Sequence, residues 1–385
     1  MNAKKTPIAW LTLVDHPRRL LASLGGVAIA SVLMFVQMGF HNGLLDSQTY
    51  VIRRLNADLF IIHRQKQAPL PQLPFPRVRV IQARGVPGVA AAYPMYLQEY
   101  GAAWKNFTDG REHPIQVFGM NPDDPVFLIP EVQRQAAALK QADTALIDSR
   151  SRRFYGATEA GFPAELSRRA VRIVGTFPLG ADFRNDGSVI VSERTFEDAL
   201  RSLDPLQRRS HVELGLLKVR PGATPESVQQ AVAAALPSDV LVLTKQQFID
   251  RTSDYWTRAK PVGIVFGIGM LVGFAMGVAI CYQILYIDIA DHLPQYATLK
   301  AMGYSNRRLV ALVLQKGFYL GALGFVPGLV ASVGAYAVLQ WYSGIRMELT
   351  LPRVLLVFAA TVAMCLVGAV IAIRGVVEAE PAEMF

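Results

Sequence analysis

The side chains that most often do chemistry in proteins form no catalytic or metal-binding pattern in this 385-residue sequence. Its six histidines never pair at metal-ligand spacing, and neither an H-E-x-x-H nor a G-x-S-x-G motif occurs. A G-x-x-x-x-G-K-[ST] phosphate loop is also missing, which excludes nucleotide hydrolysis by that device. We therefore predict a non-enzymatic chain, with no catalytic residue, cofactor or metal ion of its own.

The two cysteines also lie in unreactive surroundings. Cys281 and Cys365 each fall inside a long apolar run, where a thiol behaves as a small apolar filler. The sequence therefore predicts no disulfide framework, and the long segment 41–260 must fold without one.

The composition of the chain indicates a membrane protein. Hydrophobic residues make up 52% of the chain and charged residues only 18%, against about 25% charged in a soluble domain. Four apolar runs carry no charge and are long enough to cross a bilayer: Leu20–Phe40, Pro261–Ile287, Gly317–Ile345 and Val354–Ile373. The first run is longer than the apolar core of a signal peptide, so we expect a retained helix.

The positive charges predict the orientation of these helices, because short loops rich in Lys and Arg stay cytoplasmic. Such residues precede the first run and fill the loop between the second and third: Lys4, Lys5, Arg18, Arg19, Lys300, Arg307, Arg308 and Lys316. We therefore expect both termini inside a bacterial inner membrane and the long 41–260 segment in the periplasm. The net charge of +9 then serves topology, and no nucleic-acid partner is expected.

The predicted fold is an α-helical membrane protein with four transmembrane helices and an α+β periplasmic domain inserted between helices 1 and 2. The predicted boundaries are 1–19, a cytoplasmic interfacial helix; 20–42, transmembrane helix 1; 43–258, the periplasmic domain, with an insertion at about 100–210; 259–287, transmembrane helix 2; 288–308, a cytoplasmic coupling helix; 309–344, transmembrane helix 3; 345–352, a short periplasmic loop; 353–374, transmembrane helix 4; and 375–385, a cytoplasmic tail.

Within the periplasmic domain, the clearest unit is a predicted β-α-β at 211–248. Strands at 213–219 and 239–244 flank a helix that Thr224 can cap, running from Pro225 to about Leu236. Further strands are expected at 56–63, 171–177 and 187–196, a helix at 130–142, and a proline-rich surface loop at 67–76.

The segment 245–261 has helical spacing and leads directly into the second apolar run. We predict one stiff helix there, a stalk with Tyr255 and Trp256 at the level of an interfacial aromatic belt. Glycines at four-residue spacing in the second and third runs predict close helix packing: Gly269, Gly273, Gly277, Gly324 and Gly328. Since no charge lies within any run, we expect no hydrophilic substrate to cross among these helices.

A polar stretch, 292–310, separates two of the apolar runs. Pro294 belongs in the first turn of a short helix, Gly303 ends that helix, and Ser305 can cap the next one. A short cytoplasmic helix fixed at both ends to membrane helices transmits displacement well. Tyr296 is its largest side chain, so we expect Tyr296 to fill a groove on a partner ATPase. The full predicted coupling set is Leu293, Gln295, Tyr296, Leu299, Lys300, Met302 and Gly303.

The stretch "LPQYATLKAMGYS", residues 293–305, resembles the cytoplasmic motif of the MacB/FtsX/LolC superfamily of ABC permeases, which act by mechanotransmission. The N-terminal "AWLTLVDHPRRLLASLGGVAIASVLMFVQMGF", the tail "RGVVEAEPAEMF" and the order of spans resemble the DevC-type permeases. The resemblance covers nearly the whole chain and is weakest at 100–210.

This resemblance implies a homodimeric permease that binds membrane lipid and works with three partners: a separate DevA-like ABC ATPase, a DevB-like periplasmic adaptor, and a TolC-like outer-membrane channel. It also implies export of a lipid or glycolipid. Two alternatives stay open. An FtsX-like regulator would activate a periplasmic cell-wall hydrolase, and a membrane scaffold would work without an ATPase.

Overall fold

The computed structural model describes residues 8–15, 17–69, 72–106, 110–156, 158–182, 184–200, 210–259, 261–302, 305–343 and 347–377. The chain divides into two compact units. The first, here called the helical unit, comprises Met1–Asn42, Val262–Trp341 and Met347–Phe385. The second, here called the sheet unit, comprises Gly43–Pro261 and Tyr342–Arg346.

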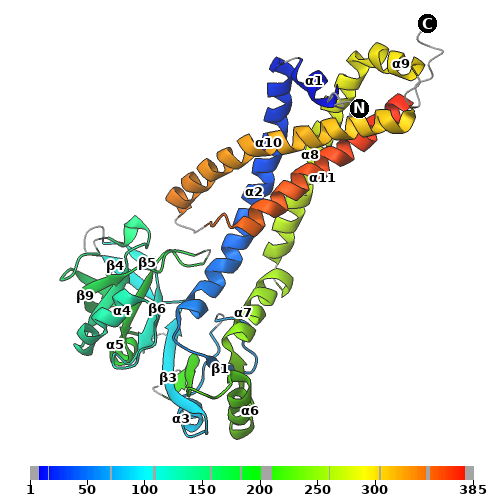
Figure 1. The fold of residues 1–385 in the computed structure, drawn as a ribbon. Coiled ribbons are helices and arrows are strands. Elements are labelled where there is room, and N and C mark those ends of the chain that lie inside the picture. Colours follow the sequence, from blue (N-terminus) through cyan, green and yellow to red (C-terminus); the bar gives the residue numbers. More distant parts are fainter. Residues whose placement is uncertain are drawn as a thin grey trace. The chain divides into compact units, whose positions relative to one another are not determined.

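Six helices contribute to the helical unit (Figure 1). They are α1 (Ile8–Val14), α2 (Pro17–Arg54), α8 (Pro261–Asp291), α9 (Leu293–Ala301), α10 (Asn306–Ser343) and α11 (Leu351–Val377). Four of them, α2, α8, α10 and α11, are long and apolar enough to cross a membrane. The predicted fold class, four such helices with a mixed α and β domain between the first and second, is therefore confirmed.

The core of the helical unit is apolar with a few polar contacts. Phe35 on α2 and Leu320 on α10 are fully buried in it. The Ser31 and Thr361 hydroxyl oxygens lie 3.1 Å apart, which pairs two polar groups that lipid could not satisfy. The two cysteines are free and buried in the same core, where they fill space between α8 and α11.

The sheet unit is built on an 11-stranded sheet in the order β13-β1-β12-β3-β6-β10-β7-β9-β8-β4-β5. The strands are β1 (Leu59–His63), β3 (Val89–Gln98), β4 (Ala103–Asn106), β5 (Glu112–Pro114), β6 (Gln116–Met120), β7 (Thr144–Asp148), β8 (Pro163–Leu166), β9 (Arg169–Phe177), β10 (Ser188–Ser192), β12 (Leu214–Val219) and β13 (Val240–Thr244). A separate two-stranded ribbon joins β2 (Phe75–Pro76) to β11 (His211–Val212).

Strand β3 makes the sheet continuous. Its residues from Val89 to Met95 pair with β12, and its last residues, Tyr96 to Gln98, pair with β6. The described parts of the predicted insertion at about 100–210 therefore extend the same sheet. Sequence pattern alone had given this region no definite fold, because its strand partners are far away in the chain.

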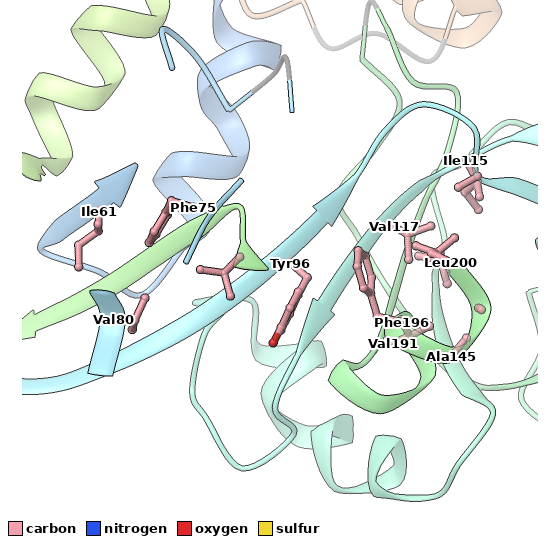
Figure 2. Close-up of a cluster of buried hydrophobic side chains, with 14 of the residues drawn as sticks. Ile61, Phe75, Val80, Tyr96, Ile115, Val117, Ala145, Val191, Phe196 and Leu200 are labelled. Atoms are coloured by element: carbon pink, nitrogen blue, oxygen red, sulfur yellow. The ribbon is translucent and has the colours of Figure 1, made fainter. Parts of the chain in front are cut away.

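Successive residues on a strand point to opposite faces of the sheet, and burial follows that rule. On β1, Leu59 and Ile61 belong to one buried cluster, while Phe60 and Ile62 belong to another. Helices α3 (Val78–Arg84), α5 (Glu193–Leu200) and α6 (Pro225–Ala235) pack into the first cluster. Figure 2 shows part of that cluster, with Phe196 and Leu200 of α5 beside Val117 and Val191 of the strands. The second cluster takes in the end of α2, α4 (Pro130–Gln135) and α7 (Lys245–Asp254).

The predicted β-α-β unit is present as β12, α6 and β13, and β1 lies between the two strands, antiparallel to both. Pro225 occupies the first turn of α6 and Thr224 precedes it as predicted. The Thr224 hydroxyl, however, donates to the Ser227 hydroxyl at 2.9 Å, and its oxygen accepts no capping hydrogen bond from the described amides of the helix.

Three local predictions differ from the structure. The sequence 193–200, predicted in part as strand, forms the helix α5, because its buried residues recur at helical spacing. The helix predicted at 130–142 is α4 followed by a 3₁₀ helix, Ala136–Lys140. The stalk is not one regular α-helix, since a π-helical turn, η3 (Tyr255–Ala259), follows α7.

Candidate functional site

The strongest candidate for a functional site is α9, a nine-residue helix between two of the long apolar helices. Pro294 lies in its first turn, and the amides of Gln295 and Tyr296 donate to the His292 carbonyl at 3.0 and 3.1 Å. After α9, the amide of Arg308 donates to the Ser305 carbonyl at 2.9 Å as α10 begins. The chain thus makes the helix–turn–helix that the positions of Pro294 and Ser305 predict, with Gly303 outside the described residues.

The described side chains of α9 divide into an outer and an inner group. Gln295, Thr298 and Lys300 are exposed, and so is Met302, the C-cap residue directly after α9, with 65% of its surface open. Leu293 and Tyr296 face the bundle of the helical unit, in a cluster with α8, α10 and α11 residues. The side chain of Leu299 lies outside what the structure describes. The outer group is available to a partner, and the inner group holds the helix in place.

The structure corrects the role predicted for Tyr296. Only 9% of this residue is exposed, and its ring packs among Leu285, Ile289 and Val313. A side chain buried in its own bundle cannot also fill a groove on another protein. Tyr296 is therefore an anchor for α9, and Met302, the C-cap residue that follows the helix, is the large apolar side chain exposed there.

A buried charge pair lies beside this anchor. The Lys316 ammonium of α10 is 2.7 Å from a carboxylate oxygen of Asp288 on α8, and 5.8 Å from the centre of the Tyr296 ring. His292, the residue before α9, places its Nδ1 atom 2.7 Å from the Asp288 carbonyl oxygen. Three helices therefore meet through four polar or aromatic side chains. In the sequence, Lys316 indicated only the topology of the helices, and Asp288 indicated no site. Both residues lie just outside the uncharged runs, so neither was expected to be buried.

The predicted packing glycines of α8 lie against α2. A Cβ atom added at Gly269 would stand 2.7 Å from the Gln37 side chain. One at Gly277 would meet the Met364 sulfur of α11 first and would stand 3.1 Å from Ala30 of α2. At Gly273 the nearest atoms, also on α2, are at ordinary contact distance. The packing role of these glycines remains a proposal, which their close approach supports.

The predicted packing glycines of α10 also approach α2. An added Cβ at Gly324 would lie 2.6 Å from Val27, and one at Gly328 would lie 2.8 Å from Ser31 and 3.2 Å from a backbone oxygen. Backbone atoms of a neighbouring helix have little freedom to move aside. Gly328 is therefore the position of this pair where a side chain is hardest to accommodate.

In the sheet unit, the predicted stalk residues occupy the π-helical turn η3. The Trp256 ring is buried and the Arg184 guanidinium lies 5.4 Å from its centre. Arg184 also donates to the Glu99 carboxylate at 2.7 Å and lies over the Tyr100 ring. Trp256 thus contacts a charged side chain from the loop before β10, and its predicted place at the level of an interfacial aromatic belt stays a prediction.

Burial dominates the electrostatics around Arg184. Burial of Glu99, only 4% exposed, raises its pKa to about 7, although Arg184 and Asn185 oppose that rise. Burial also raises the pKa of Asp182, whose Oδ1 atom accepts hydrogen bonds from the amides of Arg184 and Asn185. Within the described part of the chain, no group of three or more His, Cys, Asp or Glu side chains could hold a metal ion.

Comparison with known proteins identifies the family. Residues 20–235, more than half of the chain, match the MacB-like periplasmic core domain, and residues 263–381 match the FtsX-like permease C-terminal domain. The chain belongs to the MacB/FtsX/LolC superfamily of ABC transporter permeases. The MacB-like match covers most of α2 and much of the sheet unit, and the FtsX-like match covers the later helices α8 to α11.

Two relatives of this permease come from Mycobacterium tuberculosis, strains CDC 1551 and H37Rv. Both are described as uncharacterized ABC transporter permeases, and each is 22% identical over 314 residues, which is 81% of this chain and 81% of theirs.

Solved structures similar to part of the permease include two extracytoplasmic regions. The periplasmic region of MacB from Actinobacillus actinomycetemcomitans is 9% identical with a TM-score of 0.36, and covers 51% of this chain and 92% of its own. The extracellular domain of the Gram-positive transporter YknZ is 11% identical with a TM-score of 0.33, and covers 49% of this chain and 99% of its own.

Proposed function

We propose that this permease is the membrane subunit of a tripartite exporter, which passes ATP-driven motion from a separate ATPase to its extracytoplasmic domain. ABC permeases work with an ATPase partner, and this sequence has no phosphate loop of its own. The ATPase binds at α9, and both chain termini lie on the same, cytoplasmic side as α9. The permease itself catalyses no reaction.

The observation that carries this proposal is the division of α9 into two faces. Tyr296 on the inner face is buried against α8, α10 and α11, so α9 cannot shift without disturbing those helices. The outer face exposes Gln295, Thr298, Lys300 and Met302. A large exposed apolar side chain, here Met302 at the end of α9, with polar neighbours is the pattern of a docking helix, in which an apolar anchor enters a groove and a polar rim surrounds it.

The path from α9 to the extracytoplasmic domain follows the chain. Helix α9 adjoins the end of α8, and α8 follows α7 and η3 of the sheet unit. At η3, the Arg184 guanidinium covers the Trp256 ring. At the start of α7, the Lys245 ammonium donates to the carbonyls of Arg53 and Leu55 at the end of α2, at 3.0 and 2.8 Å. Because the chain is continuous from α7 through η3 to α8, movement of α8 would act on the contact of Trp256 with Arg184 and on the hydrogen bonds of Lys245.

The further partners and the cargo come from the resemblance to DevC-type permeases. We propose a homodimer that works with a DevB-like adaptor at the sheet unit and a TolC-like outer-membrane channel, and that exports a lipid or glycolipid. The described parts of the four long helices support an apolar cargo. Polar groups buried among these helices include the uncharged hydroxyls of Ser31 and Thr361. The buried charged pair, Asp288 with Lys316, lies at one end of α8 and not in the middle of the helices.

The test is to purify the full chain from its native membrane with its bound ATPase, and to measure ATP hydrolysis with and without the adaptor. We expect hydrolysis that the adaptor stimulates, and none from the permease after the ATPase has been removed. Met302→Asp should lose the ATPase, because a carboxylate in an apolar groove is costly. Hydrolysis by the permease alone, or retention of the ATPase by Met302→Asp, would contradict the proposal.

The same purification separates the export function from an FtsX-like regulator. A regulator would also bring down an ATPase, but in place of an adaptor it would bind a cell-wall hydrolase at the sheet unit. A scaffold would bring down no ATPase at all. Recovery of an adaptor with the complex therefore supports export, and its replacement by a hydrolase would contradict it.

A further inference from the structure

We propose that Lys316 is a positioning residue, which fixes α9 to the ends of α8 and α10 so that the three helices move together. This inference rests on the proposed function, because α9 has motion to pass on only if an ATPase binds there. According to this inference, the buried charge of Lys316 on α10 makes α8 move when α9 moves.

The first observation is the burial of the pair formed by Lys316 and Asp288. The ammonium and the carboxylate are 2.7 Å apart, and their side chains are 1% and 13% exposed. Two charges removed from water must stay together, since separating them leaves at least one charge buried without a partner. A displacement of α8 relative to α10 would do that. The pair therefore resists relative motion of these helices at this level.

The second observation is how α9 joins this pair. The His292 Nδ1 atom lies 2.7 Å from the carbonyl oxygen of Asp288, and the His292 backbone amide donates to the same oxygen at 3.3 Å. One turn into α9, the Tyr296 ring centre is 5.8 Å from the Lys316 ammonium, within the range of a cation–π contact. Lys316 thus touches α8 by an ion pair and α9 through an aromatic ring.

A second ion pair nearby has the same length as the Lys316–Asp288 pair but differs from it in burial. The Arg19 guanidinium of α2 is also 2.7 Å from a carboxylate, that of Asp291 on α8, but these side chains are 32% and 57% exposed. Water can solvate either of them when they part, so this pair holds α8 only weakly. The distances are equal and the burial differs. Arg19→Gln is therefore a matched control for the loss of Lys316.

The first test is hydrogen exchange of the full-length permease in lipid nanodiscs, without any partner. In Lys316→Met we expect the amides of α9 to exchange at least about tenfold faster than in the parent, because Asp288 loses its counter-charge. Lys316→Arg keeps the charge and should stay within about threefold of the parent. The exchange of the sheet-unit strands should not change in any variant.

The charge-reversed variant, Asp288→Lys with Lys316→Asp, tests whether the pair itself is responsible. It should restore most of the protection of α9 that Lys316→Met loses, whereas Arg19→Gln should leave α9 protected. The proposal is overturned if α9 exchanges alike in the parent and Lys316→Met. It is also overturned if strands and α9 lose protection together, since Lys316 would then only stabilise the fold.

The second test measures coupling in the complex with the ATPase. Lys316→Met should keep basal ATP hydrolysis but lose at least about fivefold of the stimulation by the adaptor, and Lys316→Arg should retain it. Unchanged stimulation in Lys316→Met would overturn the positioning role. If the parent binds no ATPase, the proposed function fails, while the exchange result still decides whether Lys316 holds α9.

Discussion

At the scale of single residues, Glu99 of the sheet unit is a carboxyl group whose charged form is disfavoured by burial. This carboxylate is almost fully buried, and its partners are the Arg184 guanidinium at 2.7 Å and the Asn185 amide at 3.2 Å. Burial raises its pKa from the ordinary value of 4.5 to about 7 despite these partners. Because Arg184 also covers the Trp256 ring, the charge of Glu99 bears on how firmly that ring is held.

Glu99 predicts a specific pH dependence of stability. The folded chain keeps a proton on Glu99 up to about pH 7, whereas the unfolded chain loses it near 4.5. The stabilisation from Glu99 is therefore complete at low pH and falls as the pH rises through this window, by on the order of 3 kcal/mol. Glu99→Gln should remove this dependence, which thermal unfolding of both proteins between about pH 5 and about pH 8 would show. A difference in unfolding temperature that stays constant with pH would contradict the prediction.

On α9, the inner and outer side chains predict opposite effects for the same substitution. Tyr296→Asp places a carboxylate in a buried apolar cluster and should cost about 3 kcal/mol of stability. Met302→Asp lies on the exposed face and should change stability by less than about 0.5 kcal/mol, while weakening ATPase binding at least about tenfold.

Thermal unfolding of the permease and titration of the ATPase onto it separate these effects. Tyr296→Phe is the control, because it keeps the buried ring and adds no charge. It should resemble the parent in both measurements. Equal loss of stability in the two aspartate variants would mean that Met302 is not on a free face.

At the scale of elements, regular segments could be predicted from the sequence, but their surroundings could not. The long apolar runs indicated the four long helices, a short apolar run indicated a strand at 56–63, where β1 lies, and the turn at Pro221–Gly222 bounded a strand at 213–219, where β12 lies. Which strands pair was beyond such patterns, because β10 lies between β6 and β7 through contacts across the fold. The π-helical turn at Tyr255 left no signal in the spacing of apolar residues.

The candidate site shows the same limit. The position of α9 could be predicted from Pro294 and the flanking apolar runs, since those are local features. The direction of Tyr296 could not, because this nine-residue helix carries apolar residues on more than one side, so the sequence does not mark which side faces inward. Lys316 and Asp288 were missed since 28 residues of sequence separate two charges that the fold brings into contact.

The glycines of α10 provide a test of helix packing with a matched control on the same helix. Gly328→Ala adds a Cβ atom 2.8 Å from Ser31 and 3.2 Å from a backbone oxygen, so it should destabilise the helical unit by about 1–3 kcal/mol. Gly334→Ala meets nothing within 4 Å and should stabilise by up to about 1 kcal/mol, because alanine favours helix.

Unfolding of both variants in the same detergent would measure the difference. If Gly328→Ala is as stable as Gly334→Ala, α2 and α10 do not approach each other closely at this glycine.

At the scale of the whole molecule, the account depends on orientation across the membrane. The distribution of Lys and Arg predicts that α9 and both termini lie in the cytoplasm and the sheet unit outside, and this orientation stays a prediction. A reporter fused near residue 150 should therefore report the extracytoplasmic side, and one fused after Phe385 the cytoplasm. The opposite result for either fusion would remove α9 from the reach of an ATPase.

The measurement that tests the central claim most directly is photo-crosslinking from α9 in the intact membrane. Benzoylphenylalanine would replace Met302 in one protein and Ile81, an exposed residue of α3 in the sheet unit, in another. We predict that the probe at Met302 crosslinks to the ATPase subunit and that the probe at Ile81 does not. A complex that contains the ATPase but yields no crosslink from Met302, or yields one only from Ile81, would contradict the assignment of α9 as the ATPase-binding helix.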